Sequence, residues 1–299
     1  MLNKTLLALA LATSLATTAS AQSAFGDLSG SGQVGYESQY VFRGKKITNS
    51  AIQPKAEIGL QTGPNGNLYL GGWSNQPVSR RSNSTGAGGP DQADEIDLFA
   101  GYIYSLPGLP LKVDFGDIYY WYPEAGNTPI YGLPGSTRTD RTDEGYIGFS
   151  WDTTNTLPSI FQGRNFNPSV YYYHDYILDS NTVEISITTV WDLTPIVGFS
   201  GLTLTPTALA GWTHANRSFG DDFTTGIAGN PHGNWSNGYL YWKGGVELDY
   251  NISPNCYLYG DLNYEGNSDK KVGGYAGSNP QLGGTPSNVW FGAGLKFRR

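Results

Sequence analysis

Strict two-residue alternation is the feature that most limits how this chain can fold. From Tyr239 to Ile252, apolar side chains occupy every second position and mostly polar or charged side chains lie between them. The stretches 182–193 and 289–298 repeat the pattern. Alternate residues of a strand point to opposite faces, whereas a helix would mix the two sets around its circumference. The pattern therefore predicts long strands, each with one apolar and one polar face.

Similar segments cover most of the chain after its first residues. Their lengths match the roughly 9 to 11 residues of a tilted strand that crosses a bilayer. A slip in the alternation at Gly116-Asp117 predicts a bulge, and Pro206 predicts a bulge or a strand end. Besides the three stretches above, we expect strands near residues 33–43, 52–61, 68–76, 94–106, 110–122, 142–151, 168–177, 202–213 and 255–265.

The connections between these segments alternate in length. Outer-membrane barrels place short turns at the periplasmic side and longer loops outside. Two connections break this alternation of short turns and long loops. The connection 152–167 is long where a turn is expected, and Asp179-Ser180-Asn181 is short where a loop is expected. Short links at 63–66, 106–109 and 252–255 otherwise alternate with Gly/Ser/Asp-rich stretches near 77–93, 123–141, 214–237 and 266–287.

Residues 1–21 have the pattern of a cleaved secretory signal peptide. Lys4 supplies the charge, the segment from Leu6 to Leu15 is apolar, and Ala19-Ser20-Ala21 ends it with small residues. No later stretch is long and apolar enough for a membrane helix, so membrane residence would require a closed barrel. We therefore expect residues 22–299 to form one all-β domain, a closed antiparallel transmembrane β-barrel of about 12 strands in the bacterial outer membrane.

Aromatic residues gather toward the ends of the expected strands. Examples are Tyr40, Tyr120, Trp151, Trp212 and Tyr250. Aromatic rings settle at the level of the lipid headgroups. The pattern therefore predicts an aromatic girdle at each edge of the membrane.

Composition and motifs argue against several other classes of function. The formal net charge is −7 without a basic stripe, so we expect no nucleic-acid partner. Cys256 is the single cysteine, and His174, His214 and His232 lack the paired spacing of a zinc helix. The string from Gly30 to Gly35 matches a dinucleotide fingerprint, but a strand follows where a helix is needed. We expect no metal and no cofactor.

Charged residues on the polar strand faces are candidates to line the interior. Charges of both signs predict a hydrated lumen, with about half of them in structural ion pairs. The excess of acid predicts a mild preference for cations or neutral solutes. The candidate pore-lining residues are Glu37, Arg43, Lys55, Glu57, Glu95, Asp97, Lys112, Asp114, Glu184, Asp192, Lys243, Glu247, Asp249, Asp261 and Lys296.

Four segments carry a family resemblance. Residues 40–44 read Tyr-Val-Phe-Arg-Gly and residues 51–54 read Ala-Ile-Gln-Pro. Residues 70–75 read Leu-Gly-Gly-Trp-Ser-Asn, and residues 94–102 read Asp-Glu-Ile-Asp-Leu-Phe-Ala-Gly-Tyr. Over about residues 34–106 the chain resembles the TorF-like porin family, which implies an outer-membrane channel without naming a solute. The chain departs from the usual outer-membrane ending, because Arg298 and Arg299 follow the aromatic Phe297.

These observations favour a channel for passive diffusion of small hydrophilic solutes, embedded in outer-membrane lipids and without enzymatic activity. One alternative is a lipid hydrolase that mounts a serine and a histidine on its lipid-facing surface. No serine shares a strand face with a histidine two residues away, although a neighbouring strand could supply one. A second alternative is a scaffold for adhesion through the long loops. The sequence leaves the oligomeric state open.

Overall fold

The structure is a computed structural model, and it describes nine stretches of the chain. The expected signal peptide at 1–21 and most of each long loop lie outside the described residues, as does His232. The described stretches are 27–48, 50–78, 94–121, 141–153, 165–177, 179–198, 200–215, 238–268 and 287–298.

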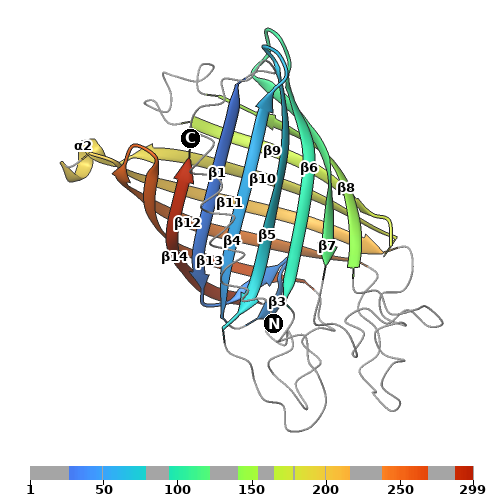
Figure 1. The fold of residues 1–299 in the computed structure, drawn as a ribbon. Helices are drawn as coiled ribbons and strands as arrows, with labels where there is room; N and C mark the ends of the chain where they lie inside the picture. The colour runs from blue at the N-terminus through green and yellow to red at the C-terminus, as the bar shows by residue number, and fades with distance from the viewer. Residues whose placement is uncertain are drawn as a thin grey trace, which may run out of the picture.

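Twelve antiparallel strands form a closed barrel, which confirms the predicted fold. Each strand pairs with its neighbours in sequence, and β1 closes the barrel by pairing with β14, for example at Gln33↔Lys296. Figure 1 shows the strands running obliquely around the barrel. The barrel strands are β1 Leu28–Glu37, β4 Ala51–Gln61, β5 Gly66–Pro77, β6 Glu95–Ser105, β7 Leu111–Trp121, β8 Arg141–Trp151, β9 Asn165–Asp175, β10 Ser180–Asp192, β11 Leu202–Ala215, β12 Gly238–Ser253, β13 Cys256–Asn267 and β14 Ser287–Arg298.

The alternation sorts side chains between the two faces of the wall. In β12, Leu240 and Leu248 are 56% and 40% exposed, whereas Tyr241 and Asp249 are 2% and 7% exposed. The apolar set therefore forms the outer surface and the polar set faces the interior, as the sequence predicts.

The predicted strand 33–43 is wrong beyond Glu37. β1 ends there, and the chain folds back as a separate two-stranded hairpin of β2 (Tyr40–Phe42) and β3 (Lys45–Thr48). The reversal occurs at Arg43 and Gly44, whose φ angles are 49° and 78°. This left-handed backbone turns the chain instead of extending the wall.

The bulge predicted at Gly116-Asp117 is also absent. β7 pairs with β6 and β8 in unbroken register through this point. Asp117 therefore faces outward and Ile118 faces inward, where it lies opposite Phe99. The interior accepts apolar groups, so Ile118 fits there without a slip in register.

Pro206 neither ends its strand nor shifts the register. It lies within β11 and pairs with Val246 of β12. The β10–β11 ladder is interrupted between Thr188↔Thr207 and Trp191↔Leu204 and then resumes in the same register. Proline has no backbone N–H to donate to the neighbouring strand, which accounts for this interruption of the ladder.

The two ends of the barrel differ in their connections. We call the end at which β7 ends and β8 begins the loop end, and the opposite end the turn end. At the turn end, β10 and β11 are joined through the short helix α2 (Thr194–Val197). β8 pairs directly with β9, so the wall has no further strand between them, although the connection near 152–167 is long. No described helix is long and apolar enough to cross a membrane.

The aromatic prediction holds in part. Trp151, Trp212 and Tyr250 are 45%, 43% and 42% exposed on the outer face. Tyr120 is 7% exposed on the inner face of β7. Tyr40 belongs to the hairpin. Tyr120 and Tyr40 therefore lie in the interior of the barrel and not in an outer aromatic girdle.

Candidate functional site

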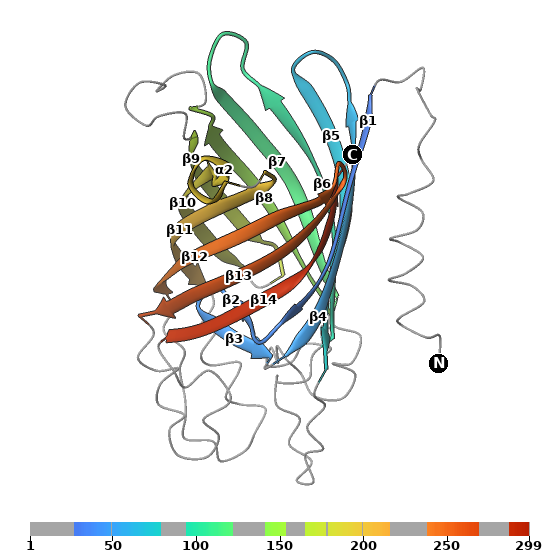
Figure 2. The same cartoon turned by 90° about the vertical axis from the view of Figure 1, so that its left-hand side faces the viewer.

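The segment 38–48, which we call the inward hairpin, lies within the loop end of the barrel (Figure 2). The ring of Tyr40 lies 5.1 Å from that of Trp73 on β5. The ring of Phe42 lies 6.3 Å from that of Tyr120 on β7. Aromatic pairs at these separations are stabilising, so both side chains attach the hairpin to the inner wall.

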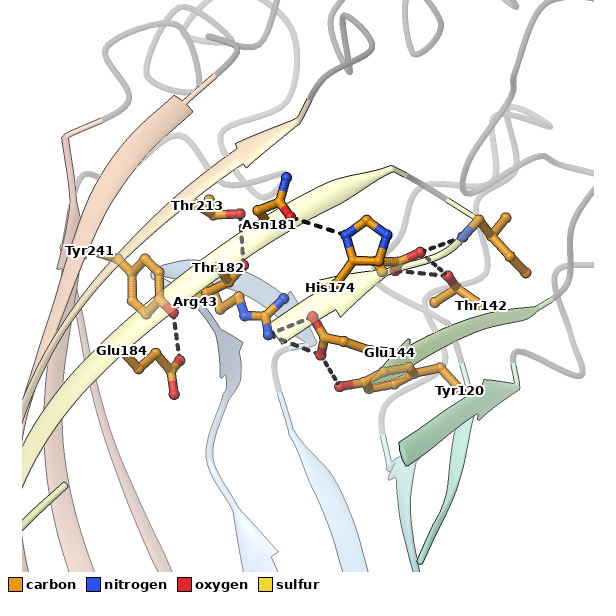
Figure 3. A network of polar contacts seen from close by, with 12 residues as sticks. Arg43, Tyr120, Thr142, Glu144, His174, Asn181, Thr182, Glu184, Thr213 and Tyr241 are labelled. Atoms are coloured by element: carbon orange, nitrogen blue, oxygen red, sulfur yellow. Dashed lines mark hydrogen bonds and ion pairs between the residues drawn. The ribbon is translucent and has the colours of Figure 1, made fainter. Parts of the chain in front are cut away.

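Arg43, at the tip of the inward hairpin, is bound to the far side of the barrel (Figure 3). Its Nη2 atom lies 2.8 Å from Oε1 and 2.9 Å from Oε2 of Glu144 on β8. The hydroxyl of Tyr120 donates to Glu144 Oε2 at 2.9 Å, and the guanidinium lies 5.2 Å from the ring centre of Tyr173. Burial opposes the charge on Arg43, but Glu144 and other acidic groups hold its pKa well above the usual value. Arg43 is therefore a fixed cation inside the barrel.

Gly44 forms the second attachment of the inward hairpin. Its N–H donates to Oε1 of Glu265 at 2.5 Å, and its carbonyl accepts from Nδ2 of Asn267 at 2.6 Å. A Cβ added at Gly44 would lie 2.8 Å from Cβ of Asn267 and 2.9 Å from the carbonyl of Gly266. Only glycine fits this close approach with a positive φ. The hairpin thus spans the loop end from β8 to β13.

Tyrosines narrow one side of the interior around a single carboxylate. The hydroxyls of Tyr69 and Tyr171 donate to the two oxygens of Asp114, at 2.8 and 2.9 Å. Tyr146 bonds to Tyr69, and the rings of Tyr171 and Tyr173 stack at 5.9 Å. Asp114 thus has a hydrogen-bonded partner on each oxygen, which a half-buried carboxylate requires.

The opposite wall carries a charged network. Lys296 Nζ lies 2.5 Å from Glu247 Oε1 and 3.2 Å from Asp249 Oδ1. The same ammonium lies 4.6 Å from the ring centre of Tyr259, whose hydroxyl accepts from Gln33 at 2.9 Å. These contacts join β1, β12, β13 and β14 where the barrel closes. They are the structural ion pairs that the sequence predicts for part of the interior charge.

Fourteen of the fifteen predicted pore-lining residues lie at inward positions of the strands, as their alternation and pairing show. Arg43 is the exception, because it projects from the hairpin and not from the wall. Lys55 and Glu57 pair at 3.6 Å while half-exposed. Lys112 and Asp192 lie at the turn end, away from the hairpin, where Asp192 accepts from the N–H of Thr194.

Sequence reasoning missed Glu144, Glu265 and Asn267, which hold the hairpin. Each occupies an inward position near the loop end of its strand. Their signal was the same alternation that identified the other candidates. Among the described residues, no group of three or more His, Cys, Asp or Glu side chains could hold a metal ion.

Solved structures with similar folds are outer-membrane proteins. LpxR from Salmonella typhimurium has a TM-score of 0.50 at 10% identity, over 89% of this chain and 99% of its own. An outer-membrane channel from Pseudomonas putida F1 has a TM-score of 0.47 at 9% identity, over 92% and 96%. The NanC porin has 0.46 at 11% identity, over 91% and 99%. At these identities the likeness concerns the fold.

The sequence comparisons give a family and no individual relative. No curated protein matches the chain. The family match covers residues 19–249 and does not name the TorF-like porins. The chain belongs to the family described as "Bacterial protein of unknown function (Gcw_chp)".

Proposed function

We propose that the protein resides in the outer membrane of a Gram-negative bacterium and forms a narrow channel for passive diffusion of small hydrophilic solutes. The observation that carries this proposal is the contrast between the two faces of one closed wall. Leu70, Ile185 and Phe291 are 55%, 61% and 56% exposed on the outside, where lipid would cover them. The interior is lined with charges and hydroxyls that require water or fixed partners.

The size of the barrel supports a narrow passage. Barrels of 8 strands are filled by side chains, whereas those of 16 to 18 strands leave a wide aqueous pore. Twelve strands lie between these cases. The inward hairpin and the tyrosines around Asp114 reduce the passage further. We therefore expect exclusion of solutes larger than small sugars.

The fixed charges of the interior support a preference for cations over anions. Among the inward side chains, acidic groups outnumber basic ones, and three of the basic groups, Arg43, Lys55 and Lys296, are already paired with carboxylates. An acidic passage attracts cations and repels anions. In this proposal solutes move down their gradients, and the protein catalyses no reaction and uses no cofactor.

Reversal potentials across a planar bilayer test this proposal. The refolded protein should produce discrete conductance steps, and a salt gradient should give a potential of the sign expected for cation preference. A clear anion preference would contradict the selectivity. Failure to conduct ions, with the barrel intact on a gel of unboiled sample, would contradict the channel.

A further inference from the structure

Three ion pairs of the interior are each completed by an aromatic ring. In each of them a basic side chain contacts a carboxylate and also lies 4.6 to 5.3 Å from the centre of an inward ring. A cation within about 6 Å of a ring centre is attracted to the ring face. The three sets are Arg43 with Glu144 and Tyr173, Lys55 with Glu57 and Phe99, and Lys296 with Asp249 and Tyr259. The interior of this barrel thus holds these cations between a carboxylate and a ring.

Asp114 has the carboxylate and the rings of such a set but no cation among the described residues. The hydroxyl of Tyr171 donates to it at 2.9 Å, and the ring of Tyr171 lies 6.3 Å from that of Tyr146. No described lysine or arginine forms an ion pair with Asp114, although Lys112 lies two positions away on the same face. Two tyrosine hydroxyls occupy two of the roughly four acceptor positions of the carboxylate. Its charge and its remaining lone pairs are therefore available to a solute.

Glycines let the tyrosine side chains lie along the wall on both sides of Asp114. Asp114 of β7, Gly148 of β8 and Tyr171 of β9 form one row of directly paired residues. A Cβ added at Gly148 would clash with the ring of Tyr171, so this ring lies over the glycine. Tyr69 of β5 reaches Asp114 from the other side over Gly101 of β6 in the same way. Asp114 and Tyr171 are both partly exposed, so a solute in the barrel can contact them.

We propose that Asp114 and the rings of Tyr146 and Tyr171 bind the guanidinium group of a small organic cation inside the barrel. This inference rests on the proposed channel, which brings solutes to this part of the wall, and it names a class of solute for it. A guanidinium group is planar and carries a delocalised charge, so it can lie on an aromatic face while its N–H groups donate to a carboxylate. An anion would meet the uncompensated charge of Asp114, and a neutral solute would gain no attraction from it.

Arg43 shows how this binding works at the neighbouring position. Its guanidinium lies 2.8 Å from Glu144 and 5.2 Å from the ring centre of Tyr173. The ring of Tyr173 stacks on that of Tyr171, which lies two residues further from the loop end on β9. Asp114 and Tyr171 thus repeat the partners of Arg43 one step deeper in the barrel, where a solute would supply the cation.

Equilibrium binding to the refolded full chain in micelles of a nonionic detergent tests the site. The probes are methylguanidinium and methylurea, which is its neutral analogue of nearly the same shape, and ligand-observed NMR measures both affinities. We expect saturable binding of methylguanidinium, at least about tenfold tighter than that of methylurea.

Variants divide this preference between the charge and the ring. Asp114→Asn should weaken methylguanidinium binding about tenfold, and Tyr171→Leu about fivefold although it changes no charge. Tyr171→Phe keeps the ring and should stay within about twofold of the wild type. Asp117→Asn is the matched control, because it removes the same charge from the outer face of the same strand and should leave the affinity unchanged. A gel of unboiled samples shows that each variant is folded.

The outcomes separate this site from the channel. Equal affinities for the two probes, or methylguanidinium binding that survives both Asp114→Asn and Tyr171→Leu, would overturn the site. A loss in Asp114→Asn that Asp117→Asn reproduces would also overturn it, because the effect would then be one of net charge. Conductance without methylguanidinium binding would overturn the site and leave the channel standing. Binding without conductance would contradict the channel and leave the site standing.

Discussion

The guanidinium of Arg43 lies 2.8 Å from the carboxylate of Glu144, so the tip of the inward hairpin is bound to the wall on the far side of the barrel. The side chain of Glu144 is 2% exposed, and that of Arg43 is 12% exposed. Removing one member of a buried ion pair costs about 3 to 5 kcal/mol, because the other charge remains buried. The position of the hairpin therefore depends strongly on this one pair.

Glu144→Gln should release the hairpin and enlarge the passage. The neutral amide cannot compensate the fixed charge of Arg43, so docked and undocked states should exchange. We expect a higher mean single-channel conductance and more current noise in planar bilayers. Glu57→Gln is the control, because its half-exposed pair with Lys55 is worth about 0 to 1 kcal/mol. Wild-type current in Glu144→Gln would show that the hairpin does not narrow the channel.

Gly44→Ala should also release the hairpin and raise the conductance, in this case through a steric clash. The added methyl group would meet Asn267 and the carbonyl of Gly266. Gly108→Ala is a matched control, because Gly108 has the same φ of 78° but no atom within 4 Å of the added carbon. Both variants share the backbone strain of about 1 to 2 kcal/mol. Only Gly44→Ala should raise the conductance, and an equal change in both would trace the effect to strain alone.

Ile185→Lys should weaken the barrel in a bilayer much more than Ser186→Lys. Ile185 is 61% exposed on the outer wall, whereas Ser186 faces the interior, where its hydroxyl lies 2.7 Å from that of Ser169. A lysine that faces lipid near the midplane costs about 2 to 4 kcal/mol. Urea titration of protein refolded into vesicles, followed on unboiled gels, measures the difference. Similar midpoints for both variants would contradict the assignment of the outer face.

Asp261→Asn should lower the preference for cations. Asp261 faces the interior of β13 opposite Glu247 of β12, beside the network of Lys296. Removing one of these carboxylates reduces the negative potential along the passage. The measured quantity is the ratio of potassium to chloride permeability, which should fall toward unity. An unchanged or increased ratio would show that Asp261 does not contribute to selectivity.

The sequence was sufficient to predict the wall of the barrel because the alternation records which face of each strand is buried. β12 was predicted within one residue at each end for this reason. The same rule failed at Gly116-Asp117, because an acid on the outer face breaks the alternation and predicted a bulge where the register is unbroken.

The inward hairpin could not be predicted from local pattern. Tyr40 and Phe42 continue the alternation of β1, and Gly44 alone does not distinguish a turn from a flexible strand end. Arg43 and Glu144 are 101 positions apart in sequence, so their contact exists only after the barrel has closed. Arg43 was therefore identified as an interior residue but assigned to the wall.

Osmotic swelling of liposomes is the most direct test of the central claim, that the barrel passes small hydrophilic solutes. Vesicles that contain the refolded protein should swell in an isotonic solution of a pentose, and more slowly in solutions of disaccharides and trisaccharides. Vesicles of the same lipid without protein supply the baseline. A swelling rate equal to that baseline for every sugar, with the protein inserted and folded, would contradict the channel and favour a barrel that serves as a scaffold.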